Sequence, residues 1–130
     1  MSKGRILVVD DQYGIRILLQ EVLSNDGYEV RVAANGQEAL DCLNEMKPHL
    51  VILDMKIPGM DGLEILREIR RRDKGVKVMM MTAYGELEMI EQADRLGVEA
   101  HFSKPFDIEL MRKTIDSALA QIDTSRQPGA

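Results

Sequence analysis

The sequence is short of cysteine and of long apolar runs. Its single cysteine, Cys42, cannot form an internal disulfide bond or a metal site built from several cysteines, which indicates a reducing compartment. No apolar run approaches the roughly 20 residues that a membrane-spanning helix requires. No secretory signal pattern opens the chain either, because residues 1–5 lead directly into an apolar run of strand length. We therefore expect a cytoplasmic protein that does not associate with a membrane.

Positive charge is also in short supply. The chain carries 17 Lys and Arg residues against 22 Asp and Glu residues, a formal net charge of −5. Proteins that bind nucleic acid directly usually present a basic face, so this composition gives no reason to expect direct nucleic-acid binding. With 130 residues, of which 45% are hydrophobic, the chain has the size of one globular domain. We expect that domain over residues 1–122 and a disordered polar tail over residues 123–130.

Short apolar runs alternate with segments of helical period, which is typical of βαβ units in a parallel sheet. The runs predict strands at residues 5–9, 29–33, 49–53, 76–81 and 98–102. Apolar residues at helical spacing predict helices around residues 15–23, 39–43, 63–69, 87–96 and 108–119. Asn35 followed by Glu38 resembles a helix-starting capping box, and Gly27 and Gly97 stand where helices are expected to end.

Strands and helices that alternate in this way allow few windings once right-handed crossovers are required. We expect an α/β fold with a doubly wound, five-stranded parallel sheet in the order 2-1-3-4-5 and five helices. In this order the first and third strands are neighbours at a topological switch point. Ligands of such folds bind there, outside the carboxyl ends of the strands.

Three carboxylates stand at that expected edge. Asp10 and Asp11 directly follow the first apolar run, and Asp54 follows the third. Like charges at about 4 Å repel by ~4 kcal/mol at an effective dielectric near 20, so either the carboxyl pKa values rise or a cation neutralises the cluster. Oxygen ligands suit a hard divalent ion, and Mg²⁺ is the natural candidate. Alternatively, one of the first two aspartates caps the first helix, where aspartate is common.

A carboxylate beside a divalent cation can act as a nucleophile towards phosphorus, and the product is an aspartyl phosphate. Thr82 ends the fourth run and Lys104 follows the fifth, so a hydroxyl and an ammonium are available to hold the phosphoryl charge. Pro105 biases Lys104 away from helical dihedral angles, and a cis bond between them would fix the lysine over the edge of the sheet. The alternatives are a solvated surface lysine and a threonine that caps the following turn.

Five short motifs add to these residues. They are Asp10-Asp11, Asp54, Ile57-Pro58-Gly59-Met60-Asp61-Gly62, Thr82-Ala83 and Lys104-Pro105. In this order and spacing they resemble the receiver domain of bacterial two-component response regulators, over about residues 4–122. The resemblance implies a CheY-like, flavodoxin-like fold that catalyses its own phosphorylation on Asp54 and is not a turnover enzyme. The implied ligands of Mg²⁺ or Mn²⁺ are Asp10, Asp11, Asp54 and the backbone carbonyl of Lys56, with Thr82 and Lys104 at the phosphoryl group.

Longer stretches of the sequence resemble one particular group of receiver domains. Residues 10–19, 54–62, 81–87, 101–102 and 104–107 look like those of single-domain response regulators in the sporulation phosphorelay of endospore-forming bacilli. Such a protein accepts phosphate from a sensor histidine kinase and passes it to a histidine phosphotransferase, and an aspartyl-phosphate phosphatase is a further implied partner. The implied docking surface comprises Gln12, Tyr13, Gly14, Ile15, Leu18, Pro105 and Phe106. Ile17 falls opposite the apolar stripe of the first helix and would extend that surface.

His101 departs from the wider family, in which Tyr or Phe occupies this position. By the resemblance, that ring and Thr82 form a switch that exposes a new surface after phosphorylation. A histidine does not offer the same aromatic switch, and it would titrate near neutral pH. The alternative is a half-buried histidine whose ring is hydrogen-bonded.

Other functions stay open from the sequence. One is a receiver that binds an effector protein directly when phosphorylated, and another is the receiver half of a DNA-binding regulator with residues 123–130 as linker. A dehalogenase-like phosphatase also forms an aspartyl phosphate, but that class usually has an acid/base aspartate two residues after the nucleophile, where this chain has Lys56. A flavodoxin-type FMN site is disfavoured, because Asp10-Asp11 stands in place of a hydroxyl- and glycine-rich phosphate loop.

Overall fold

The computed structural model describes residues 2–82 and 87–120, and the tail expected over residues 123–130 lies outside them. Within the described residues, five parallel strands form a sheet in the order β2-β1-β3-β6-β7, which confirms the predicted order 2-1-3-4-5. Its strands are β1 (Arg5–Val9), β2 (Glu29–Ala33), β3 (Leu50–Asp54), β6 (Lys77–Thr82) and β7 (Ala100–Ser103). The helices are α1 (Tyr13–Asn25), α2 (Gly36–Met46), α3 (Gly62–Arg72), α4 (Leu87–Arg95) and α5 (Ile108–Leu119). The predicted elements are therefore confirmed, with strand boundaries shifted by up to two residues.

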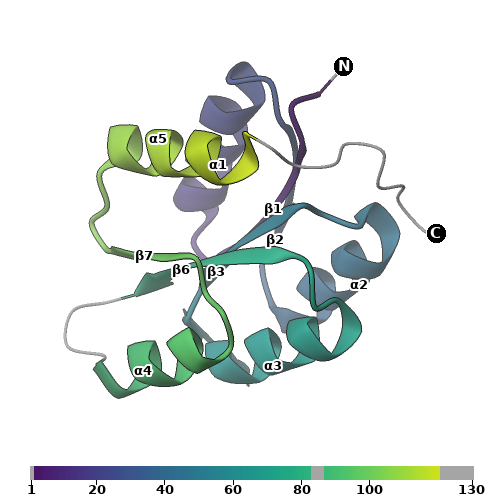
Figure 1. Ribbon diagram of the computed structural model, residues 1–130, viewed down its shortest axis with the longest axis vertical. Coiled ribbons are helices and arrows are strands. Elements are labelled where there is room, and N and C mark those ends of the chain that lie inside the picture. The colour runs from purple at the N-terminus through teal and green to yellow at the C-terminus, as the bar shows by residue number, and fades with distance from the viewer. Residues whose placement is uncertain (1, 83–86, 121–130) are drawn as a thin grey trace.

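Helices cover both faces of the sheet (Figure 1). α1 and α5 pack on one face, and α2, α3 and α4 pack on the other. Successive strand residues point to opposite faces, so Ile6 joins the core under α1 and α5 while Leu7 joins the core on the other side. β1 and β3 are buried along their whole length. The continuous apolar runs of the sequence are thus central strands of a parallel sheet, which need apolar residues on both faces.

A short hairpin, which the sequence did not predict, follows β3. Its strands, β4 (Lys56–Ile57) and β5 (Met60–Asp61), pair antiparallel around Pro58 and Gly59. Gly59 has a φ of +93°, the left-handed conformation that a type II turn requires after proline and that glycine adopts freely. The hairpin therefore turns the chain back immediately after the strand that carries Asp54.

α3 begins in close contact with the end of β3. The side chain of Asp61 caps the helix, because its Oδ1 accepts the backbone N–H of Leu63 at 2.9 Å. The backbone N–H of Gly62 donates to the Met55 carbonyl at 3.2 Å. A Cβ atom at Gly62 would lie 2.4 Å from the Met55 Cα, so only glycine fits at this position.

The predicted helix boundaries at Asn35, Gly27 and Gly97 are confirmed. The Asn35 side chain accepts the N–H of Glu38 at 2.9 Å, and the Glu38 carboxylate accepts the N–H of Ala34 at 2.8 Å, one residue before the position expected for a capping box. Gly27 and Gly97 follow α1 and α4 with φ values of 103° and 79°. These glycines therefore end the helices in the left-handed conformation.

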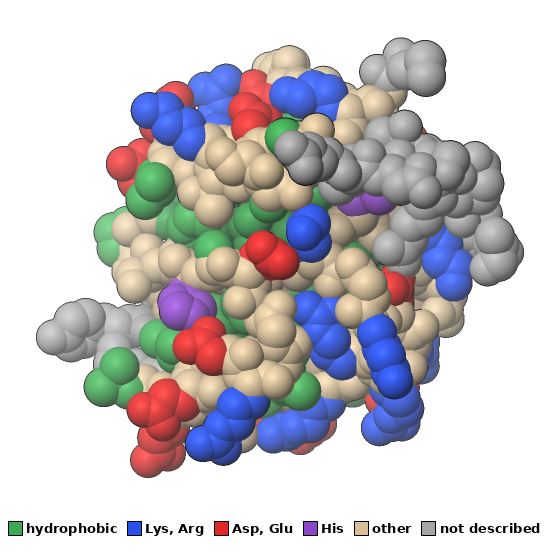
Figure 2. All heavy atoms as spheres, viewed as in Figure 1, with side chains coloured by type: hydrophobic (Ala, Val, Ile, Leu, Met, Phe, Trp, Pro, Cys, Tyr) green, Lys and Arg blue, Asp and Glu red, His purple; other side chains and the backbone are tan. Residues whose placement is uncertain are grey.

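Basic side chains gather in the lower right of Figure 2, around α3, although the chain is acidic as a whole. The last turn of α3 carries Arg70, Arg71 and Arg72, which complement the negative end of the helix dipole. Glu68 pairs with Arg71 and with Arg72 on the same helix, each at 3.2 Å. Among the helices of residues 2–82 and 87–120, we find no candidate for a membrane span.

Candidate functional site

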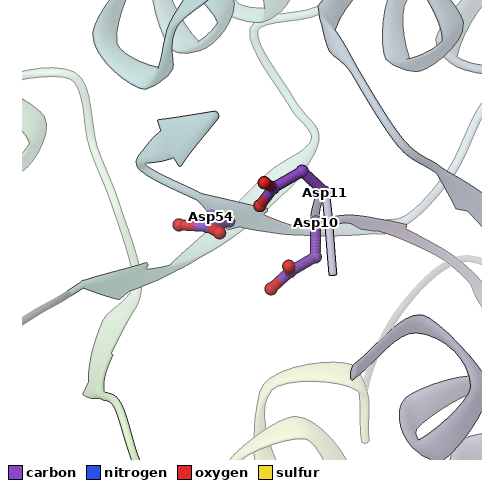
Figure 3. A group of neighbouring side chains, drawn as sticks. All are labelled: Asp10, Asp11 and Asp54. Carbon is purple, nitrogen blue, oxygen red and sulfur yellow. The ribbon is translucent and has the colours of Figure 1, made fainter. Parts of the chain in front are cut away.

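The ends of β1 and β3 bring together the three aspartates singled out in the sequence. Asp10 and Asp11 follow β1, and Asp54 is the last residue of β3. The two strands are paired in the sheet, so their carboxyl ends lie side by side. One oxygen of each carboxylate lies within 4.8 Å of the others, and the three side chains project beyond the strand ends into the same space (Figure 3). Asp10 and Asp54 are buried, whereas Asp11 is exposed.

The N-cap residue of α1 is Gln12, and its side chain makes no capping hydrogen bond. The alternative in which Asp10 or Asp11 is the N-cap of the first helix is therefore wrong. Asp10 instead accepts the backbone N–H of Gln12 through Oδ1 at 2.8 Å. Its other oxygen, Oδ2, is left to face the neighbouring charged groups.

Lys104 follows β7 and reaches both buried carboxylates. Its ammonium nitrogen lies 2.9 Å from Oδ2 of Asp10 and 3.0 Å from Oδ2 of Asp54. A third hydrogen bond, at 3.2 Å, runs to Oε1 of Gln12. The Lys104–Pro105 peptide bond is cis. The alternative of a solvated surface lysine does not describe this side chain, which is 22% exposed and paired with two carboxylates.

Burial and charge set the pKa values of this pair. Burial raises the pKa of Asp54 above its ordinary value, and hydrogen bonds from the Lys56 backbone N–H and from Lys104 offset only part of that rise. Burial acts to lower the pKa of Lys104, but the hydrogen bonds to Asp10 and Asp54 outweigh it, so that pKa is raised. These surroundings therefore favour the protonated form of Lys104 and disfavour the ionised form of Asp54.

The donor set fits a divalent metal ion. Three carboxylates and one ammonium leave two negative charges at the sheet edge, which is the charge that such an ion balances. Clustered carboxylate oxygens are hard ligands and suit Mg²⁺ or Mn²⁺. The backbone N–H of Lys56 donates to Oδ1 of Asp54 at an N–O distance of 3.0 Å. This hydrogen bond keeps Lys56, whose carbonyl oxygen is an implied metal ligand, next to the cluster.

Thr82 ends β6, and Lys104 directly follows the neighbouring strand β7, so both residues lie at the same edge of the sheet. Thr82 is buried at the end of β6, and Asp54 pairs with Met81 in the ladder between β3 and β6. The backbone N–H of Lys104 donates to the Thr82 carbonyl at 2.8 Å. Ala83 of the sequence motif, and the turn that the threonine was alternatively expected to cap, lie outside the described residues.

The implied docking surface includes exposed apolar groups on α1. Tyr13 is 70% exposed and Leu18 is 43% exposed. Ile17, which the helical period placed opposite the apolar stripe, is 42% exposed, so that prediction is confirmed. The remaining members of the surface are Gln12, Gly14 and Pro105, which are exposed, and Ile15 and Phe106, which are partly buried.

His101 lies on β7 with its Nε2 atom 2.8 Å from Oδ1 of Asp94 on α4. This hydrogen bond agrees with the alternative of a hydrogen-bonded ring, but the residue is exposed rather than half-buried. The sequence did not identify Asp94 as its partner, because the two residues belong to different elements. The contact links α4 to the edge strand.

Sequence reasoning also missed the contact between Gln12 and Lys104. The only signal was a long polar side chain immediately after Asp10-Asp11, at the predicted start of the first helix. The two residues are 92 positions apart in the sequence. Only the packing of β7 beside β6 brings the lysine close enough.

Known proteins share these features. The model of the response regulator receiver domain family matches residues 6–116. The chain is 53% identical to sporulation initiation phosphotransferase F of Bacillus subtilis over 92% of its own length and 96% of that protein. It is 36% identical to the regulatory protein AtoC of Escherichia coli over 89% of its length, but spans only 25% of that longer protein. A CheY-like receiver domain protein from Methanospirillum hungatei has the same fold, with a TM-score of 0.85 at 32% identity, over 89% of this chain and 93% of that one.

Proposed function

The chain belongs to the response regulator receiver domain family, and from that premise we propose that Asp54 accepts a phosphoryl group from a phosphohistidine of a partner protein. The observation that carries this proposal is the position of Asp54, buried and 3.0 Å from the Lys104 ammonium within a cluster of three carboxylates. Phosphoryl transfer depends mainly on positioning and on stabilisation of charge. This edge of the sheet supplies a nucleophile, a cation site and hydrogen-bond donors together.

In the proposed step, a carboxylate oxygen of Asp54 attacks phosphorus. A phosphorus–oxygen bond forms while the phosphorus–nitrogen bond of the phosphohistidine breaks, and its electron pair stays on the imidazole. Mg²⁺ or Mn²⁺, when bound, neutralises charge on the phosphoryl oxygens. The residues proposed to hold the ion are Asp10, Asp11, Asp54 and, through its carbonyl, Lys56. The Lys104 ammonium and the Thr82 hydroxyl are proposed to donate to the phosphoryl oxygens.

The residue at position 56 favours storage of the phosphoryl group over hydrolysis. Lys56 stands two residues after the proposed nucleophile, where an acid/base aspartate would be needed to activate water in a phosphatase of the dehalogenase type. An ammonium cannot take a proton from water. We therefore propose self-catalysed phosphorylation and transfer, without turnover of a substrate.

Within a two-component system, the proposed place of the protein is a phosphorelay that initiates sporulation. The support is the 53% identity to sporulation initiation phosphotransferase F over nearly the full length of both chains. For the present chain, the proposed partners are a sensor histidine kinase, a histidine phosphotransferase and an aspartyl-phosphate phosphatase, and the proposed compartment is the cytoplasm. Neither nucleic acid nor a membrane is a proposed partner.

The proposed docking surface for the phosphotransferase is the start of α1 together with the residues after Lys104. Exposed apolar groups are concentrated there, with Tyr13, Ile17 and Leu18 all more than 40% exposed. Because Gln12 contacts Lys104, this surface borders the proposed phosphorylation site directly. A helix bundle docked on it would bring its histidine close to Asp54.

Labelling with a radioactive small-molecule phosphodonor tests the phosphoacceptor. In the presence of Mg²⁺ the wild-type chain should incorporate label, and Asp54→Asn should incorporate none while keeping its fold. Asp41→Asn, an exposed aspartate on α2, is the matched control and should label at the wild-type rate. Persistent labelling of Asp54→Asn would remove this residue from the mechanism.

Transfer to a purified histidine phosphotransferase tests the relay. Label should leave the phosphorylated chain and appear on the histidine of the acceptor before much of the acyl phosphate has hydrolysed spontaneously. Loss of label only to water would instead favour a stand-alone receiver that binds an effector directly. The control is a phosphotransferase variant whose acceptor histidine is replaced by alanine, which shows whether the added protein merely accelerates hydrolysis.

A further inference from the structure

A hollow with a mainly basic lining lies between the ends of α3 and α4. It has a volume of about 510 Å³, and among the described residues that line it Glu99 alone is acidic. The basic residues of the lining are Arg70, Lys74, Lys77 and Arg95. Residues 67–77 contain six Lys and Arg residues but two Asp and Glu residues, a net charge of +4 in a chain whose total is −5. Positive charge is therefore concentrated at this hollow (Figure 2).

The fold itself uses only part of this positive charge. Glu99 pairs with Lys77 at an O–N distance of 3.6 Å, and Asp73 directly precedes Lys74. The carboxyl ends of α3 and α4 each carry about half a negative charge, so the nearby negative charge is about three units against four cations in the lining. Lys74 and Arg95 are exposed and have no ion-pair partner within residues 2–82 and 87–120. These two side chains are therefore available to a ligand.

Arg70 gives the hollow a fixed wall. Its guanidinium donates to the carbonyl oxygens of Val76, Leu96 and Gly97, which joins the end of α3 to the start of β6 and the end of α4. An arginine has five N–H donors, so two remain beyond these three hydrogen bonds. Gly75 and Gly97 line the hollow without adding a side chain to it. The space between the cations is thus held open by backbone contacts.

The donors of the hollow suit carboxylates of a peptide better than a compact phosphate. The backbone N–H of Gly75 donates to Asp73, and that of Gly97 donates to the carbonyl of Asp94, so neither can contribute to a phosphate-binding nest. The available cations stand at the ends of exposed, flexible side chains. A nucleic acid is disfavoured, because its extended negative charge would also meet the acidic remainder of the protein.

We propose that this hollow docks an acidic segment of a partner protein. It lies at the opposite edge of the sheet from Asp54, because β6 begins at Lys77, in the lining, and ends at Thr82, beside the aspartate cluster. At about 3.3 Å per residue these two positions are roughly 17 Å apart. A partner held there leaves Asp54 open to a second protein. The proposal goes beyond the proposed function and does not depend on phosphorylation.

Fluorescence anisotropy with a labelled octapeptide of alternating Glu and Gly tests the charge recognition. The intact chain should bind this peptide saturably at low salt, and should not bind the matching peptide with Gln in place of Glu. Lys74→Gln and Arg95→Gln should each raise the Kd about two- to fivefold. Lys113→Gln, at an exposed lysine on α5, removes the same charge elsewhere and should leave the Kd unchanged. Absence of binding, or an equal loss in Lys113→Gln, overturns the proposal.

NMR and competing anions test the place and the class of the ligand. The peptide should shift the backbone amide signals of Gly75 and Gly97 but not that of Gly14 on α1. A lower Kd for inorganic tripolyphosphate or for a short single-stranded DNA, at equal ionic strength, would overturn the peptide as occupant. Asp54→Asn should bind the peptide as wild type does, and Lys74→Gln should incorporate phosphoryl label at the wild-type rate. Failure of this proposal is therefore distinguishable from failure of the phosphoacceptor function.

Discussion

At the scale of single residues, burial and the proposed function place opposite demands on the charge of Asp54. The residue is only 5% exposed, and both burial and the neighbouring charge of Asp10 raise the pKa of its carboxyl group. The Lys56 N–H and the Lys104 ammonium offset only part of this effect. As the proposed nucleophile towards phosphorus, Asp54 must be ionised, and its negative charge then lowers the stability of the fold.

Asp54→Asn should therefore stabilise the unphosphorylated protein at neutral pH. A folded-state pKa above the unfolded value means that the unfavourable contribution of the charge is present above the folded pKa and is relieved as pH falls towards the ordinary value of 3.8. Urea unfolding without Mg²⁺ should show a gain of about 1 kcal/mol at pH 7 that shrinks towards pH 4. Asp11→Asn, at an exposed position, should show a smaller gain. A benefit of Asp54→Asn that grows as pH falls would contradict this account.

At the scale of the element, the connection from β3 to α3 controls where the proposed nucleophile stands. The hairpin turns at Gly59, whose φ is positive, and Gly62 then packs its backbone on Met55, the residue after Asp54. No side chain separates the start of α3 from the end of the strand. Gly59 permits the turn and Gly62 permits the close backbone contact, so together they keep this short connection next to the site.

Gly62→Ala should destabilise the protein by about 1–3 kcal/mol, because the new Cβ would lie 2.4 Å from the Met55 Cα and 2.6 Å from the Met55 carbonyl oxygen. Gly14→Ala is the matched control. Nothing lies within 4 Å of a Cβ atom at Gly14, which sits in the first turn of α1, so this change should stabilise by about 0.5–1 kcal/mol. Urea unfolding measures both, and equal stabilities of the two variants would contradict the packing argument.

At the scale of the whole molecule, the site exists only in the folded chain. Its side chains come from the ends of β1, β3, β6 and β7, and Lys104 meets Asp10 across 94 positions of sequence. The unfolded chain does not hold these oxygens together. A cation that binds the cluster therefore binds the folded state in preference and stabilises it by mass action.

Mg²⁺ should raise the temperature of unfolding of the wild-type chain. At a concentration 100 times its Kd the expected stabilisation is about 2.7 kcal/mol, which corresponds to several degrees for a domain of this size. Asp10→Asn removes a buried carboxylate that is a proposed ligand and should abolish most of the effect. Calorimetry at constant ionic strength separates binding from screening by salt, and an equal shift in Asp10→Asn would place the ion elsewhere.

Much of the fold could be predicted because its causes are local. The continuous apolar runs at β1 and β3 indicate strands that are buried on both faces of the sheet. The helical stripes between the strands indicate helices that are buried on one face. Right-handed crossovers then leave few strand orders, and the correct order makes Asp10 and Asp54 neighbours. The β4–β5 hairpin was missed because two-residue strands have too few residues for a periodic pattern to appear.

The pattern of apolar runs was thus enough to leave few strand orders, and in the order that the structure confirms, the three aspartates meet because they stand at the ends of paired parallel strands. Tertiary structure alone decided how the Lys104 ammonium divides its hydrogen bonds and that Gln12 accepts one of them. It also decided that His101 meets Asp94 on the exposed edge. Contacts of these long side chains depend on where neighbouring elements pack in three dimensions, and no sequence period encodes that placement.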